Sequence, residues 1–197
     1  MSSLLLLSGG IDSICLASQH RPKVCFTVDY GQCAAQAEIN SAKEVCKSLG
    51  LRHIHQKVKI GFLGSGQMAG QSNSPVSPNS EFWPFRNQFL VTLAGMLALK
   101  EECTQVMIAS VSSDQRHVDG SSTFRSLLHQ LLSLQEGNLS LVAPAAEMTS
   151  EMLVRASGIT FDVLAWAHSC HTGNTACGRC PGCLRHSQVM QSVGLNR

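Results

Sequence analysis

The residues at positions 8–13, Ser-Gly-Gly-Ile-Asp-Ser, have the properties of an anion-binding turn. They follow four consecutive leucines and precede an apolar stretch that is compatible with a helix. Two glycines let the backbone approach an anion closely, and the first N–H groups of a helix would face that anion. The hydroxyls of Ser8 and Ser13 add donors, and Asp12 can orient the loop or a metal ion. The segment lacks the lysine of a Walker loop. It predicts a different kind of phosphate-binding turn, although a tight turn without a ligand fits the same residues.

Four cysteines near the C-terminus have the spacing of a metal site. Cys170, Cys177, Cys180 and Cys183 form the pattern C-x6-C-x2-C-x2-C. Two overlapping CxxC pairs and a fourth thiolate can close a tetrahedral Zn²⁺ site. The same short spacing also serves iron–sulfur clusters, and unligated thiols are a further alternative. Because a closed four-cysteine zinc site contributes folding energy rather than catalysis, we predict a structural site.

Strands and helices are expected to alternate along the chain. Apolar runs predict strands at 3–8, 24–28, 52–60, 106–111 and 140–144, and helices at 11–19, 34–49, 87–100, 123–134, 148–156 and 160–167. Such alternation predicts an α/β fold with a doubly wound parallel sheet, which binds ligands at the carboxyl ends of its strands. Residues 1–167 would form this domain, and residues 168–197 a zinc-binding segment packed on it. Residues 61–80, rich in Gly, Ser, Asn and Pro, predict a long surface loop.

The composition excludes several function classes. The 197 residues are 44% hydrophobic and 14% charged, which is typical of a globular protein. A net charge of +2 without a run of Lys or Arg argues against a nucleic-acid-binding surface. No apolar run is long enough for a membrane helix, and the N-terminus lacks the basic region of a signal peptide. We therefore expect a cytoplasmic protein with neither a membrane nor a nucleic acid as partner.

The turn Ser-Gly-Gly-x-Asp-Ser resembles the pyrophosphate-binding loop of the adenine nucleotide alpha hydrolases, also called N-type ATP pyrophosphatases. That superfamily splits ATP between the α- and β-phosphates and leaves AMP on an acid or amide oxygen. With Asp-Tyr-Gly-Gln at 29–32, Phe-Trp-Pro-Phe-Arg-Asn at 82–87 and the terminal cysteines, the chain resembles the QueC family over its whole length. This family of 7-cyano-7-deazaguanine synthases, which works in queuosine biosynthesis, converts 7-carboxy-7-deazaguanine to a nitrile with ATP and ammonia.

The resemblance implies ligands and roles. The residues implied to bind ATP are Ser8, Gly9, Gly10, Asp12, Ser13, Asp29, Tyr30, Gly31, Gln32, Arg86 and Asn87. Those implied in catalysis are Ser8, Asp12, Ser13, Arg86 and Asp119, and the four cysteines match the family's zinc ligands. Mg²⁺ would accompany ATP, and the protein would be a homodimer. Each assignment has an ordinary structural alternative: Asp29 and Asp119 also suit simple turns, and Arg86 could pair on the surface.

The chain departs from the family pattern mainly in the half that receives nitrogen. Cys33-Ala34 replaces Arg-His, residues 117–121 replace Tyr-Pro-Asp-Cys-Arg, and Ser150 stands in place of a lysine that opens a helix. The resemblance thus predicts an ATP-dependent carbon–nitrogen ligase, forming AMP and pyrophosphate, that adenylates 7-carboxy-7-deazaguanine and passes it to ammonia or to a protein amine. The alternatives are a divergent enzyme of an anti-phage (antiviral) defence system, a tRNA-modifying ATP pyrophosphatase, and a zinc-binding scaffold without catalysis.

Overall fold

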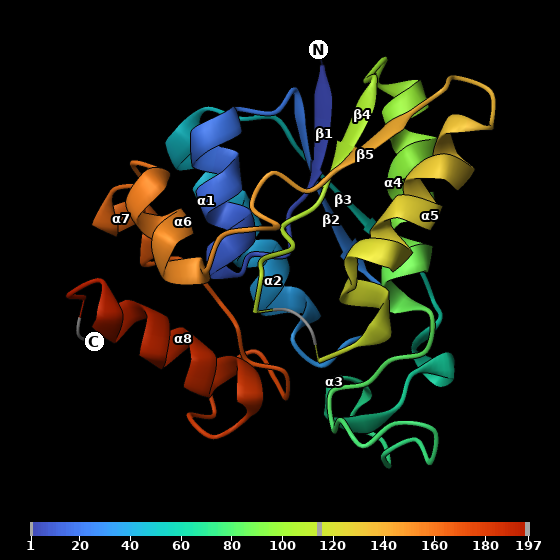
Figure 1. The fold of residues 1–197 in the computed structure, drawn as a ribbon. Coiled ribbons are helices and arrows are strands. Elements are labelled where there is room, and N and C mark those ends of the chain that lie inside the picture. The colour runs from blue at the N-terminus through green and yellow to red at the C-terminus, as the bar shows by residue number, and fades with distance from the viewer. Residues whose placement is uncertain (1, 114–115, 196–197) are drawn as a thin grey trace.

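Five parallel strands form one sheet in the computed structural model, which describes residues 2–113 and 116–195 (Figure 1). The order in the sheet is β3-β2-β1-β4-β5. The strands are β1 (Ser3–Leu6), β2 (Val24–Asp29), β3 (His53–Lys57), β4 (Gln105–Met107) and β5 (Ser140–Val142). The predicted α/β fold with a parallel sheet is confirmed. Residues 1, 114–115 and 196–197, which the predicted domain ranges include, lie outside the described residues.

Helices cover both faces of this sheet (Figure 1). The longer helices are α1 (Ile11–His20), α2 (Ala35–Leu49), α4 (Arg86–Lys100), α5 (Ser122–Ser133), α6 (Ser150–Ala156) and α8 (Pro181–Ser192). Two four-residue helices, α3 (Gly66–Ala69) and α7 (Phe161–Leu164), and two 3₁₀ turns, Gly61–Leu63 and Val118–Gly120, complete the elements. One core contains residues of α1, α2, α6, α7 and α8, and the other contains residues of α4 and α5.

The central strands are apolar on both sides because both of their faces are covered. Successive leucines of β1 divide between the two cores: Leu5 packs with α1 and α2, and Leu4 packs with α4. The same alternation holds in β2, where Cys25 belongs to the first core and Phe26 to the second. The register places Leu4 beside Val24, so that β1 lies at the centre of the sheet. The turn that follows β1 is thereby attached to the central strand of the sheet.

Some boundaries differ from the predicted ones. The strand predicted at 52–60 is shorter, because β3 is an edge strand whose residues are half-buried or exposed. The loop predicted at 61–80 contains α3 and a 3₁₀ turn. Gly50 caps α2 with a φ of 61°, the positive value expected at a helix end.

Among the described residues, no helix has both the length and the apolar character needed to cross a membrane.

Helix α8 has no counterpart among the predicted elements. It begins directly at the third cysteine of the cluster: Cys180 is the N-cap, and Pro181 occupies the first helical turn. The helix packs against α6. The division of the chain at residue 167 stays a prediction, although α8 and the preceding loop do lie against the sheet domain (Figure 1).

Candidate functional site

The residues of the anion-binding turn gather at the carboxyl end of β1, where α1 begins. Gly9 adopts a φ of 76°, which favours glycine. The hydroxyls of Ser8 and Ser13 hydrogen-bond each other at 3.1 Å, and Ser13 Oγ also donates to the Gly10 carbonyl at 3.0 Å. Ser8 is exposed, whereas Ser13 is buried. The turn therefore presents one exposed hydroxyl and the amino end of a ten-residue helix to solvent.

Gly9 is enclosed by two other parts of the chain. Its carbonyl oxygen accepts hydrogen bonds from Ser41 Oγ at 2.9 Å and from the His168 N–H at 2.8 Å. A Cβ atom at Gly9 would lie 2.8 Å from the Glu38 carbonyl oxygen and 3.0 Å from Ser41. No larger residue fits there without moving α2, so the shape of the turn is fixed from behind.

Asp12, in the first turn of α1, faces a guanidinium that comes from α8. Arg185 Nη2 lies 3.6 Å from Asp12 Oδ2. The same nitrogen donates to Ser113 Oγ at 2.7 Å and to Ser150 Oγ at 2.9 Å. Ser150 opens α6 and is buried. A positive charge is therefore present beside the turn, although the sequence Ser-Gly-Gly-Ile-Asp-Ser contains none.

The segment after β2 uses its predicted site residues to shape a loop. Asp29 is buried, accepts a hydrogen bond from the Gly31 N–H at 3.0 Å, and pairs with Lys57 Nζ at 2.9 Å. Gly31 has a φ of 100°, and a Cβ atom there would lie 2.6 Å from the Gly61 Cα. The carboxylate of Asp29 thus holds a tight loop in place, and a direct contact of Asp29 with nucleotide stays a prediction.

Gln32 is the centre of a buried hydrogen-bond network. Its Oε1 accepts from the Tyr30 N–H at 2.9 Å, and its Nε2 donates to the Val28 carbonyl at 3.0 Å. The same Nε2 donates to Glu38 Oε2 at 2.8 Å. Because these contacts involve both polar atoms of the amide, Gln32 serves the loop and also connects it to α2.

Glu38 is a residue that the sequence reasoning missed. Burial raises the pKa of its carboxyl to about 7, while the Gln32 hydrogen bond and the charge of Arg86 act in the opposite direction. Its backbone carbonyl lies directly behind Gly9. The signal in the sequence is weak, since an acidic residue in the first turn of a helix is common. The structure shows Glu38 between the anion-binding turn and Arg86.

Arg86, Asn87 and Asp119 come together at the start of α4. Asp119 Oδ2 accepts from the Asn87 N–H at 3.3 Å, and the Asp119 carbonyl accepts from Asn87 Nδ2 at 3.2 Å. Asp119 therefore caps this helix. Arg86 Nη1 donates to the Met68 sulfur at 2.9 Å. Burial raises the pKa of Tyr30, while the positive charge of Arg86 acts to lower it. The predicted catalytic residues thus form two clusters, one at the turn and one here.

A buried acid that was not predicted lies next to this second cluster. Glu81 pairs with Arg116 Nη2 at 3.1 Å and lies 3.6 Å from His117 Nε2. The ring of His117 is stacked near Phe82 with centroids 6.2 Å apart. Glu81, Phe82 and His117 line a small cavity together with Trp83, Arg86 and Asp119. We call Glu81, Arg116 and His117 the acid–base patch.

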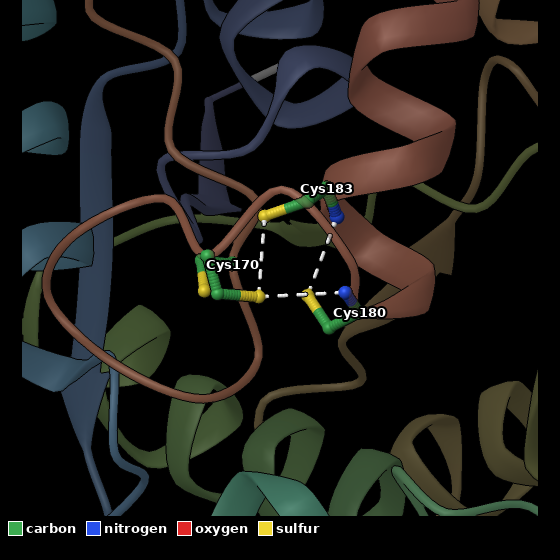
Figure 2. Close-up of side chains that lie close together, drawn as sticks. Cys170, Cys180 and Cys183 are labelled. Carbon is green, nitrogen blue, oxygen red and sulfur yellow. Dashed lines mark hydrogen bonds between the residues drawn. The ribbon is translucent and has the colours of Figure 1, made fainter.

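The four cysteines meet at the beginning of α8 (Figure 2). Their sulfur atoms lie within 4.8 Å of one another. Three of the cysteines are buried, and Cys177 lies closest to solvent. The Cys180 sulfur accepts from the N–H groups of His171 at 3.3 Å and Cys183 at 3.4 Å. Figure 2 shows Cys180 and Cys183 on the helix end and Cys170 on the preceding loop.

This arrangement fits a zinc ion. Four sulfurs placed about 2.3 Å from a tetrahedral zinc would be about 3.8 Å apart, and the sulfurs of Cys177 and Cys183 are 3.9 Å apart. Hydrogen bonds, first from the Thr172 hydroxyl and then from backbone N–H groups, lower the pKa of Cys177 to about 5. Burial raises the pKa of Cys183 to about 12, so a cation would be needed to hold all four as thiolates. The predicted cysteine cluster is confirmed, and zinc is the ion that it suggests.

Comparison with known proteins gives the same family over nearly the whole chain. The family model described as "Queuosine biosynthesis protein QueC" matches residues 2–194. A protein of Methanosarcina mazei named 7-cyano-7-deazaguanine synthase is 24% identical, with 99% of this chain and 96% of that protein covered. A protein of the same name from Desulforudis audaxviator is 28% identical, with 98% of each chain covered.

A third relative, from Chlorobaculum parvum and again named 7-cyano-7-deazaguanine synthase, is 26% identical, with 99% of this chain and 94% of that protein covered. These alignments extend over 215 to 223 residues, more than the 197 of this chain, so the relatives carry insertions. At such identity the comparisons give the family, and they leave the substrate open.

Proposed function

Because the chain belongs to the QueC family, we propose that it is an ATP-dependent ligase that adenylates the carboxylate of 7-carboxy-7-deazaguanine and transfers the acyl group to nitrogen. The observation that carries this proposal is the turn between β1 and α1. There the Gly9 backbone, the Ser8 and Ser13 hydroxyls and the helix end bring together N–H and O–H donors, which suit an anion.

The chemistry follows from the leaving groups. A carboxylate does not transfer its acyl group to an amine, whereas an acyl adenylate does because AMP departs readily. In the first step the carboxylate oxygen attacks the α-phosphorus of ATP, and the bond to pyrophosphate breaks. N–H donors of the turn stabilise the negative charge that develops on pyrophosphate, and they hold it in line with the attacking oxygen. In the second step nitrogen attacks the acyl carbon, loses a proton, and AMP leaves, which gives an amide. A nitrile would need a second ATP, because the amide oxygen must be adenylated and leave with AMP.

The residues beside the turn have matching roles. Asp12 is a carboxylate of the donor type that Mg²⁺ prefers, and Mg²⁺ bound with ATP supplies charge neutralisation at the phosphates. Gly31 and its neighbours, held by Asp29 and Gln32, form the loop against which the nucleoside would lie. Arg86, the Asp119-capped start of α4 and the acid–base patch would line the side that receives the deazaguanine.

The four-cysteine site would act through structure. Zinc bound by Cys170, Cys177, Cys180 and Cys183 supplies folding energy, which would fix the start of α8 and the loop before it. That loop donates the His168 N–H to Gly9. The family resemblance also implies a homodimer. Light scattering of the purified protein would measure its molar mass and so test this oligomeric state.

The acceptor is either ammonia or a protein amine. The observation that keeps the second candidate is the acid–base patch, since His117, which lies beside Glu81 together with Arg116, stands where the family pattern has another residue. A conjugating enzyme of this kind would suit a role in antiviral defence. The net charge of +2 supports neither tRNA binding nor another strongly anionic partner.

The test is mass spectrometry of reactions with ATP, Mg²⁺, 7-carboxy-7-deazaguanine and ammonium, with pyrophosphate measured in parallel. We expect AMP and pyrophosphate with an amide or a nitrile, and strong loss in Ser8→Ala and Asp12→Ala. Ser18→Ala, which alters a serine farther along α1, is the matched control. Adenylation without an ammonia product, together with a mass shift on a protein partner, would identify the conjugating enzyme. No pyrophosphate with any deazaguanine acid would contradict the proposal and favour a scaffold.

A further inference from the structure

The cysteine cluster and the anion-binding turn are connected by two separate routes. The first is the loop before α8, where the His168 N–H donates to the Gly9 carbonyl at 2.8 Å, two residues before Cys170. The second is α8 itself, where Arg185 follows Cys183 by two residues and reaches Asp12. The segment that carries the cysteines therefore contacts the turn at two places, through His168 and through Arg185.

Close packing fixes the two routes to each other. A Cβ atom at Gly182 would lie 1.9 Å from the Ser169 carbonyl oxygen and 2.7 Å from His171 Nε2. The Ser169 hydroxyl and His186 Nδ1 are hydrogen-bonded at 3.1 Å. Helix α8 therefore cannot rotate or slide without displacing the loop that bonds to Gly9. The position of Arg185 is set by the cluster as much as by its own contacts.

Two hydroxyl groups lie closer to Nη2 of Arg185 than the Asp12 Oδ2 atom does. Its Nη2 lies 2.7 Å from Ser113 Oγ and 2.9 Å from Ser150 Oγ, compared with 3.6 Å from Asp12 Oδ2. The hydroxyls come from the segment after β4 and from the start of α6, both at the carboxyl edge of the sheet. This side chain is thus directed to the edge at which the turn opens.

We propose that Arg185 is a phosphate-binding residue of this site, placed beside the turn by the cysteine cluster, and that it donates to the pyrophosphate portion of ATP. The inference rests on the proposed function and adds to it. A guanidinium carries five N–H donors in a planar fork that matches phosphate geometry. The residues of the turn bring no cation of their own, so Arg185 would supply the positive charge that offsets the charge on departing pyrophosphate.

The proposal changes what the metal site does. Loss of the metal would free the start of α8 and move Arg185 away from the turn, so affinity for pyrophosphate would fall along with stability. The cysteine cluster would then act on the reaction through Arg185, without contact with the substrate.

Titration calorimetry with inorganic pyrophosphate and Mg²⁺ tests this directly. Wild type, Arg185→Gln, Arg185→Lys and the matched control Arg179→Gln are compared, since Arg179 is an exposed arginine of the same cluster segment. We expect Arg185→Gln to raise the Kd by about tenfold to hundredfold, as for a lost charged hydrogen bond. Arg185→Lys keeps the charge without the fork and should lose less, and Arg179→Gln should stay within about twofold.

Each outcome decides one question. A folded Arg185→Gln protein that binds pyrophosphate within about twofold of wild type overturns the role of Arg185. If Arg185→Gln does not fold, Arg185→Lys decides, because loss of the guanidinium fork should weaken binding, and unchanged affinity in that variant overturns the role. If wild type and Arg185→Gln bind pyrophosphate equally well, the role of Arg185 is wrong, but the proposed function still stands. Wild type that neither binds nor releases pyrophosphate contradicts the proposed function itself.

Discussion

The anion-binding turn and the acid–base patch are held in place by different means. At the turn, the main contacts involve the backbone: Gly9 accepts hydrogen bonds from Ser41 and His168 and leaves no space for a Cβ atom. At the patch, the contacts involve side chains: the buried Glu81 pairs with Arg116 at 3.1 Å and lies 3.6 Å from His117. Departures from the family pattern occur beside the patch, at residues 117–121, and also at Cys33-Ala34 and at Ser150, which contacts Arg185.

This difference indicates which part of the chemistry is shared with the family. Backbone donors bind a phosphate whatever the rest of the substrate is, so the turn can stay the same while other groups change. Side-chain pairs recognise a particular partner, and they change when that partner does. We therefore expect the ATP half-reaction to follow the family and the acceptor step to be the place where this protein differs.

The largest expected effect comes from Gly9→Ala, which tests the backbone half of the comparison. The new Cβ would meet the Glu38 carbonyl at 2.8 Å with a φ of 76°, so the turn must open. We expect pyrophosphate release to fall by about a hundredfold, with a stability cost of about 1–3 kcal/mol. Release assays and urea melts measure the two effects.

Gly10→Ala is the control for stability. Gly10 has a φ of −82°, and its nearest neighbour would be Ser8 Oγ at 3.5 Å, an ordinary contact. It should unfold at nearly the wild-type urea concentration. A Gly9→Ala protein that keeps release within about threefold of wild type would show that the tight turn is unnecessary.

The next effect concerns the cysteine cluster that supports the turn. Cys180→Ser removes the sulfur that accepts two N–H groups and that would bind metal. We expect loss of bound zinc, measured by elemental analysis, and a melting temperature lower by several degrees, because metal binding contributes to folding. Cys103→Ser, a buried cysteine outside the cluster, is the control and should keep its zinc. Full zinc content in Cys180→Ser would mean that the cluster is not the binding site.

Stability is expected to depend on pH through Glu38, which lies between the anion-binding turn and Arg86. The pKa of Glu38 is raised from 4.5 to about 7, so the folded protein holds a proton that the unfolded chain releases. Stability from this group is complete below about pH 4.5 and is lost as pH rises through about 7, with a slope of at most about 1.4 kcal/mol per pH unit.

Glu38→Gln imitates the protonated acid and should remove this decline. The measurement is the free energy of unfolding between pH 5 and 8 in urea. Glu44→Gln, on the same helix, removes a carboxylate that pairs with Lys47 and should keep the wild-type decline. Parallel curves for wild type and Glu38→Gln would contradict the raised pKa.

The smallest effect is expected at the acid–base patch. Glu81→Gln removes pairs with Arg116 and His117, of which Arg116 is largely exposed, so we expect about 1 kcal/mol of lost stability. The KM for the deazaguanine acid should rise a few-fold while the KM for ATP is unchanged. Steady-state kinetics with each substrate varied separately measure this. Equal changes in both KM values would contradict the proposal that the turn binds ATP and the patch faces the deazaguanine acid.

The parts of the site that could be predicted from the sequence are those whose residues are close together in the chain. Ser8 to Ser13 form one turn, and the four cysteines lie in a short segment, so their grouping follows from local spacing. Glu38 and Glu81 could not be predicted, because Arg86, whose charge acts on Glu38, and Arg116, which pairs with Glu81, are brought near only by the fold.

The elements show the same distinction. The helix that ends at Gly50 was predicted to its last residue, since a positive-φ glycine marks that end locally. Helix α8 was missed, although Cys180 and Pro181 form its start, because the cysteines there were interpreted only as metal ligands. The pairing of Arg185 with Asp12 depends on that helix, and no local pattern indicates it.

The most direct measurement is exchange of labelled pyrophosphate into ATP, which occurs only if the enzyme forms an acyl adenylate reversibly. We predict exchange that requires 7-carboxy-7-deazaguanine, proceeds without any nitrogen acceptor and falls by about a hundredfold in Gly9→Ala. Folded wild-type protein that shows no exchange with this acid, and no affinity for ATP, would contradict the assignment of the turn between β1 and α1 as an ATP site.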